Sequence, residues 1–199
     1  MAKKNLKRGL ALGALMAFVI TGSAMAASVR NDSLTNVTSI NASSDFEKPW
    51  GEASDRSYAY AADDGNTYSI KSEIGSTVEF VNELIGYTRN YGIALENKSS
   101  LIIDANVSVK TTIDSEGSHT RAIRNNKGNN LIFNGNATIT SINNKGLAIG
   151  VDGWTNSITE FNGENTIIDV TAGADDLYGV QARENAKIIF NGKNTTING

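Results

Sequence analysis

The chain has 199 residues, including 18 Lys or Arg, 21 Asp or Glu and no cysteine. This length allows one domain of ordinary size, and the lack of cysteine excludes a disulfide scaffold, a cysteine-ligated zinc site and a cysteine nucleophile. The formal charge is −3, or −7 without the four basic residues at positions 3–8, and this mildly acidic balance argues against nucleic acid as a partner.

Residues 1–26 have the pattern of a secretory signal peptide. Four basic residues within positions 3–8 precede an apolar run at positions 10–20, and Ala24-Met25-Ala26 offers the small residues that signal peptidase recognises. A transmembrane anchor is the alternative, but polar residues from Thr21 onward end the run short of the roughly 20 residues that a bilayer requires. We therefore predict cleavage between Ala26 and Ala27, which takes the formal charge from −3 to −7.

Residues 27–90 are predicted to form an irregular N-terminal cap and a first imperfect coil. The stretch up to position 55 is rich in Ser, Asn and Asp, whereas residues 58–61 and 68–70 alternate like strands. Ser76 and Glu79 have the spacing of a helix capping box, and apolar residues follow with helical spacing. This pattern favours either a short helix at about residues 77–88 or a further pair of strands.

Residues 91–199 contain a repeat of 28 to 30 residues. Its first marker is a Phe-Asn-Gly triplet, found at Phe133-Asn134-Gly135, Phe161-Asn162-Gly163 and Phe190-Asn191-Gly192, with Ile103 in the same place one repeat earlier. A second marker, a small residue followed by a β-branched one, precedes it by 11 residues at Gly92-Ile93, Ala122-Ile123, Gly150-Val151 and Gly179-Val180. A third follows at Val109, Ile139 and Ile167, and then at Thr196, where the apolar residue has moved to Ile197. A fixed period of this length is typical of solenoids.

Within each repeat, short apolar runs alternate with Asn- and Gly-rich corners, which predicts about three short strands per repeat. We therefore predict an all-β fold, a parallel β-helix with coils of 28–30 residues after a cleaved signal peptide. Its stacked coils would place Phe133, Phe161 and Phe190 in one interior column. The Asn and Gly of each triplet would stack at a corner, where amide side chains can hydrogen-bond along the column. These residues are Asn134, Asn162 and Asn191, followed by Gly135, Gly163 and Gly192. An antiparallel sandwich also has short strands, but it does not predict matched side chains at a fixed period.

The sequence indicates no catalytic, cofactor-binding or metal-binding residue. The one histidine, His119, is predicted to be an exposed loop residue. The pairs Asp63-Asp64 and Asp175-Asp176 resemble turns, and neither has the spacing of a calcium loop; the remaining acids considered are the isolated Asp104, Glu160 and Asp169. An arginine base of a lyase is conceivable at Arg121, Arg124 or Arg183, but no acidic cluster recurs beside them in the sequence.

The signal peptide and repeats such as Phe161-Asn162-Gly163-Glu164-Asn165-Thr166-Ile167 together resemble the N-terminal part of an autotransporter passenger domain from a diderm bacterium. The resemblance implies a right-handed β-helical stalk that passes through the periplasm and is carried outside by a C-terminal β-barrel translocator. The chain ends inside a repeat, at Asn198-Gly199, so we expect a truncated passenger whose unpaired edge favours self-association.

We therefore expect an adhesin-like scaffold that is exported to the cell surface, outer membrane or extracellular space and contacts an unidentified host or bacterial surface ligand. It is expected to have no enzymatic activity and no cofactor, and insertions at residues 114–120 and 172–177 are its expected contact features. The alternative is a fragment of a secreted β-helix polysaccharide lyase or hydrolase, which rests on fold analogy alone.

Overall fold

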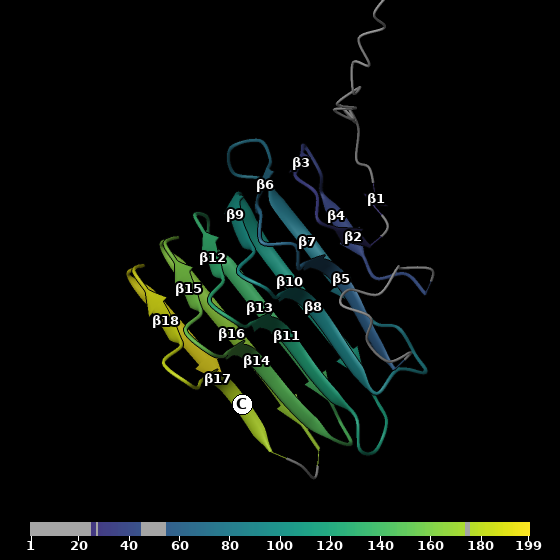
Figure 1. Cartoon of the computed structure of the whole chain (residues 1–199). Coiled ribbons are helices and arrows are strands. Elements are labelled where there is room, and N and C mark those ends of the chain that lie inside the picture. The colour runs from purple at the N-terminus through teal and green to yellow at the C-terminus, as the bar shows by residue number, and fades with distance from the viewer. Residues whose placement is uncertain (1–24, 27, 45–54, 174–175) are drawn as a thin grey trace, which may run out of the picture.

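The computed structural model describes residues 25–26, 28–44, 55–173 and 176–199. These residues form strands joined by turns, in three parallel sheets that stack around one core (Figure 1). The structure confirms an all-β solenoid, with about five turns. In its described part no helix is long and apolar enough to cross a membrane.

Each turn of the solenoid contributes one strand to each sheet. Sheet A contains β1 (Met25–Ala26), β4 (Ser39–Asn41), β7 (Thr77–Asn82), β10 (Asn106–Ile113), β13 (Ala137–Asn143), β16 (Asn165–Ala172) and β19 (Asn194–Asn198). Sheet B contains β2 (Val29–Arg30), β5 (Arg56–Ala62), β8 (Arg89–Leu95), β11 (His119–Asn125), β14 (Leu147–Gly153) and β17 (Leu177–Ala182). Sheet C contains β3 (Leu34–Thr35), β6 (Thr67–Lys71), β9 (Ser100–Asp104), β12 (Asn130–Phe133), β15 (Ile158–Phe161) and β18 (Lys187–Phe190). Strand pairing between turns is parallel, which excludes the antiparallel sandwich.

The Phe-Asn-Gly triplet marks the corner that follows sheet C. Ile103, Phe133, Phe161 and Phe190 are in register, and the rings of the last three stack with centroids 4.8 and 5.2 Å apart and nearly parallel planes. Phe133 and Phe161 are fully buried. Stacked aromatic pairs contribute about 0.5–1.5 kcal/mol beyond the burial of their surface.

Two asparagine ladders run along this corner. In the first, the amide of Asn191 donates to Asn162, that of Asn162 to Asn134, and that of Asn134 to the carboxylate of Asp104, at 2.8, 3.1 and 2.6 Å. In the second, each of Asn106, Asn136 and Asn165 accepts a hydrogen bond from the equivalent residue of the next turn. The corner residues of successive turns are therefore joined by side-chain hydrogen bonds.

The glycine of the triplet is needed because the corners approach each other closely. A Cβ on Gly135 or Gly163 would lie 2.2 Å from the carbonyl oxygen of the preceding corner, and one on Gly192 would lie 2.0 Å away. None of the three has a positive φ, so the requirement is for space and not for an unusual backbone conformation.

The register corrects the third marker by one residue. Ile139 pairs with Ile168, and Ile168 with Ile197, whereas Ile167 lies on the outer face and is 39% exposed. The cause is Glu164, an extra residue in the corner between the stacked Gly163 and the ladder residue Asn165, which moves the following strand along by one position.

The helix predicted for residues 77–88 is wrong, and the strand alternative is confirmed by β7. Val78 and Phe80 are fully buried on alternate positions, with exposed residues between them. The backbone of β7 pairs with both β4 and β10. This two-sided pairing outweighs the local capping pattern, because the strand gains hydrogen bonds from both neighbours and a buried face.

The corner stacking predicts a large effect of one added methyl group. We expect Gly163→Ala to lower the free energy of unfolding by about 1–3 kcal/mol, since backbone atoms that cannot move aside occupy the Cβ position. Gly153→Ala is the matched control, because its Cβ would meet the nearest side-chain atom at 3.3 Å. Urea unfolding of the two variants measures the difference, and equal stability would contradict the role assigned to the corner glycines.

Candidate functional site

The outer face of sheet B holds the charged site of the molecule, and the second marker determines which side chains reach it. In β11, both Ala122 and Ile123 face the core, so Arg121 and Arg124 on either side of them both point outward. The first residue of the second marker is small because there is no space for a larger one. A Cβ on Gly150 would lie 2.5 Å from the side chain of Ile168 across the core.

Two stacked tyrosines form the floor of this face. Tyr58 of β5 and Tyr91 of β8 are in register, with ring centroids 5.1 Å apart, and both are at most 1% exposed. The guanidinium carbons of Arg121 and Arg124 lie 5.9 and 5.7 Å from the centroid of the Tyr91 ring, within the range of cation–π contacts. Burial raises the pKa of Tyr58 well above its ordinary value, so this phenol remains neutral beneath the cations.

Glu96, in the turn after β8, is the first of two buried carboxylates beside these arginines. Its side chain is 1% exposed and forms ion pairs with Arg124 at 3.1 Å and with Lys127 at 3.3 Å. It also accepts a hydrogen bond from the side-chain amide of Asn126 at 3.0 Å. Arg124 also donates to the hydroxyl of Tyr91 at 3.3 Å. A buried carboxylate with this many donors fixes the side chains that surround it.

Asp152, on β14, is the second buried carboxylate and is also 1% exposed. It accepts from Nε of Arg121 at 2.8 Å, from Nη2 of Arg183 at 3.3 Å and from the indole Nε1 of Trp154 at 2.7 Å. The guanidinium of Arg183 in turn lies 3.7 Å from the centroid of the Trp154 ring. Asp152 thus orients two cations and one aromatic side chain from three successive turns.

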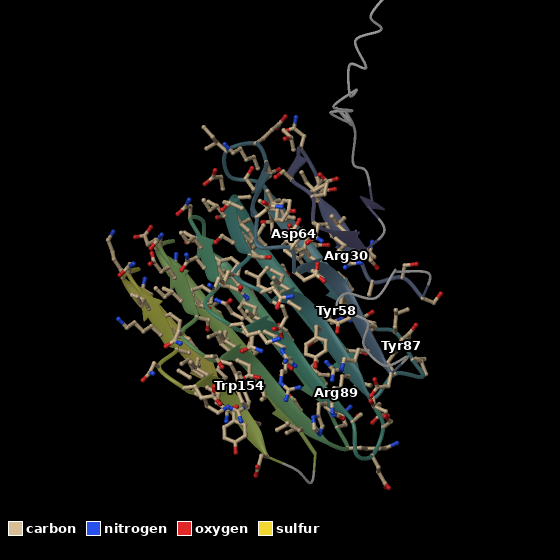
Figure 2. The ribbon with its side chains drawn as sticks, viewed as in Figure 1. Arg30, Tyr58, Asp64, Tyr87, Arg89 and Trp154 are labelled. Carbon is tan, nitrogen blue, oxygen red and sulfur yellow. The ribbon has the colours of Figure 1, made fainter. Side chains whose placement is uncertain are left out.

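A groove of about 440 Å³ runs across this face. Five cationic side chains line it, together with two carboxylates and uncharged polar or aromatic groups: Arg56, Arg89, Arg121, Arg124, Lys127, Asp152, Glu184, Asn126, Trp154 and Thr155. We call it the sheet B groove. Two of its lining residues, Arg89 and Trp154, are labelled in Figure 2. Positive charge is therefore concentrated in one place on a chain whose net charge is negative.

The electrostatics of Arg124 favour a permanent cation. Burial lowers the pKa of its guanidinium, but the neighbouring Tyr91 and Glu96 raise it by more, so the pKa lies above the ordinary arginine value. A guanidinium held in this way is a poor proton acceptor. It is well suited to hold an anionic group by charge-assisted hydrogen bonds.

The structure brings together the three arginines considered from the sequence, Arg121, Arg124 and Arg183, and places acids beside them. The sequence has no acidic cluster that recurs beside these arginines, but in the structure two single carboxylates, Glu96 and Asp152, lie against them. The expectation of an exposed loop histidine is wrong: His119 is the first residue of β11, is only partly exposed, and pairs in register with Arg89 and Leu147.

The acids singled out from the sequence lie apart from the groove. Asp63 pairs with Arg30 at 3.0 Å, Asp104 accepts from the ladder residue Asn134, and Asp169 accepts from Asn198 of β19. Glu160 is on β15. Asp64 lies in a turn, where it accepts the backbone N–H of Asn66. Asp176 accepts from the hydroxyl of Tyr178, while Asp175 lies outside the described residues.

Ala24 and Ala27, which flank the predicted cleavage site, also lie outside the described residues, and cleavage remains a prediction. Met25–Ala26, on the leader side of the site, form β1 beside β4. The contact features expected at residues 114–120 comprise a loop at 114–118, because His119 and Thr120 already belong to β11. Part of the second feature, residues 174–175, is not described.

Sequence reasoning missed Glu96, Asp152, Trp154 and the pair of Arg56 and Arg89. A signal for some of them was present in the second marker. Ala94, Arg124 and Asp152 each follow that marker directly, so aligning the repeats places Arg124 and Asp152 on neighbouring strands. The contacts between charged residues can be predicted only when the outward-facing positions of successive repeats are aligned, and not the apolar positions alone.

Among the described residues, no group of three or more His, Cys, Asp or Glu side chains is arranged to hold a metal ion. Comparison of the chain with family models, with curated proteins and with solved structures found no match.

Removing the Asp152 carboxylate tests how the site is held together. We expect Asp152→Ala to lower the free energy of unfolding by about 3–5 kcal/mol, because Arg121, only 12% exposed, would lose its buried partner. Asp114→Ala, which breaks an exposed ion pair with Lys145, is the control and should cost about 0–1 kcal/mol. Equal unfolding midpoints for the two variants in urea would show that Asp152 does not hold the site.

Proposed function

We propose that this protein is an exported, non-enzymatic scaffold of the autotransporter passenger type, which acts like an adhesin through the sheet B groove. The signal-like N-terminus and the solenoid of regularly stacked turns support this proposal. In the proposal, the chain passes through the periplasm to the cell surface, outer membrane or extracellular space. A C-terminal β-barrel translocator completes the full-length protein.

The observation that carries the proposal is the way in which the groove is built. Its lining residues come from successive turns between Arg56 and Glu184, and the buried carboxylates of Glu96 and Asp152 hold its central cations. The result is a long, pre-organised polar surface on a rigid support. Such a surface reduces the entropy lost on binding, which favours recognition of a ligand without any further catalytic group.

Chemistry at the groove also favours binding over lyase activity. Abstraction of a sugar proton by arginine requires a guanidinium that can lose its own proton, and the surroundings of Arg124 favour its charged form. Arg121 already uses its Nε–H to hold the buried Asp152 carboxylate. The polysaccharide lyase or hydrolase therefore stays the alternative, and release of unsaturated or reducing sugars would be its signature.

Adhesion by purified protein tests the proposed contact surface. We expect the double variant Arg89→Gln/Lys127→Gln, named here the groove variant, to lose most binding to host or bacterial cells. The matched loop variant, Asp114→Ser/Glu116→Ser, changes the insertion between β10 and β11 and should bind like the wild type. Flow cytometry with labelled protein measures both.

Loss of binding in the loop variant alone would move the contact site to the insertions. Absence of cell binding by the wild type, or release of sugars from an acidic polysaccharide panel, would contradict the scaffold function itself.

A further inference from the structure

Like charges lie side by side in the sheet B groove. Arg56 of β5 and Arg89 of β8 are partners in the parallel register, on strands about 4.8 Å apart. Neighbouring like charges on a sheet destabilise it. Arg89 forms no ion pair with any of the described residues. Burial, Arg89 and Arg124 all act to lower the pKa of Arg56, and this effect exceeds the opposing effect of Tyr91 and Tyr58.

The groove is longer than a site for one small anion. Its lining reaches from Arg56 on β5 to Glu184 just after β17, which crosses five neighbouring strands of sheet B. Four steps of about 4.8 Å span about 19 Å along the solenoid axis. An extended chain that lies along this axis would meet cations from several turns in succession.

The other lining groups point to a chain that carries hydroxyls as well as acids. Asn126, Thr155 and Glu184 can donate to or accept from hydroxyl groups, and the Thr155 hydroxyl already lies 2.5 Å from the Glu184 carboxylate. Arg121 donates its Nε to Asp152, and within the described residues its terminal nitrogens make no hydrogen bond. Guanidinium groups of this kind bind carboxylate or sulfate with two parallel hydrogen bonds.

Single-stranded nucleic acid fits the groove less well. Non-specific binding of single strands uses exposed aromatic rings on which bases stack. Here the rings of Tyr58 and Tyr91 are at most 1% exposed, and Arg183 covers a face of the Trp154 ring.

We infer that the sheet B groove binds a linear acidic polysaccharide, whose carboxylate or sulfate groups pair with Arg89, Arg121 and Lys127 along the solenoid axis. This inference names the ligand class of the proposed contact surface and therefore rests on the proposed function. Whether the acidic groups are carboxylates or sulfates is decided by the probes used below.

The test is binding of purified protein to polygalacturonate, dextran sulfate and uncharged dextran by calorimetry, with single-stranded DNA as a fourth probe. We expect at least one acidic polysaccharide to bind, with an affinity that falls as salt is raised, and dextran not to bind. The groove variant should bind that polysaccharide about tenfold or more weakly. Lys187→Gln, which removes a cation from β18 of sheet C, should change the affinity less than about twofold.

Thermal unfolding separates this interpretation from a structural role of the same residues. Arg89→Gln should melt at the same temperature as the wild type or higher, because it relieves repulsion with Arg56 while weakening binding. A large loss of stability would instead show that Arg89 is needed for folding.

The ligand class is overturned if neither acidic polysaccharide binds, if the groove variant binds as tightly as Lys187→Gln, or if DNA binds more tightly than both. If these results occur while the groove variant still fails to bind cells, the contact surface stands and only its ligand class is wrong. If the groove variant binds cells normally, the proposed contact surface fails as well.

Discussion

The close, in-register stacking of one turn on the next is the constraint on which the rest of this structure depends. Neighbouring strands in all three sheets are about 4.8 Å apart, so each residue meets its equivalent one repeat away. At the corner after sheet C, this spacing excludes any side chain at Gly163, lets the amides of Asn134 and Asn162 join, and brings the rings of Phe133 and Phe161 into contact. Residues of the same type therefore recur at a fixed interval in the sequence because their side chains must pack against one another at this spacing.

The same spacing shapes the charged face. Because outward residues also meet their equivalents, a cation on one turn lies close to whatever occupies that position on the next. Two arrangements of charge along these columns are found. Arg124 is followed in its column by Asp152, and Glu96 accepts from Arg124 and Lys127, so opposite charges alternate there. Arg56 and Arg89, by contrast, are both cations in one column. The first arrangement stabilises the face, and the second places two positive charges side by side in the sheet B groove.

Much of the fold could be predicted from the sequence, because a short period and an interior column of large side chains leave few alternatives. Two local features escaped this reasoning for physical reasons. The corner residue Glu164 shifts β16 by one position, which the earlier intervals do not reveal, and pairing of β7 on both sides overrides a helical pattern. The groove was harder to predict, because Glu96 and Asp152 each form an ion pair with an arginine of a neighbouring repeat. A search along the sequence for adjacent catalytic groups does not compare such positions, although the second marker contains the alignment that would.

Site-directed disulfide formation tests the register most directly, and a cysteine-free chain is well suited to it. Thr138 and Ile167 are partners on the outer face of β13 and β16, within the Cα separation of about 4.4–6.8 Å that a disulfide allows. We expect Thr138→Cys/Ile167→Cys to form an intramolecular disulfide rapidly in the folded protein. Thr138→Cys/Asp169→Cys, displaced by two residues on the same face, should not. Rapid disulfide formation in the displaced pair, or in neither pair, would contradict the stacking on which this account depends.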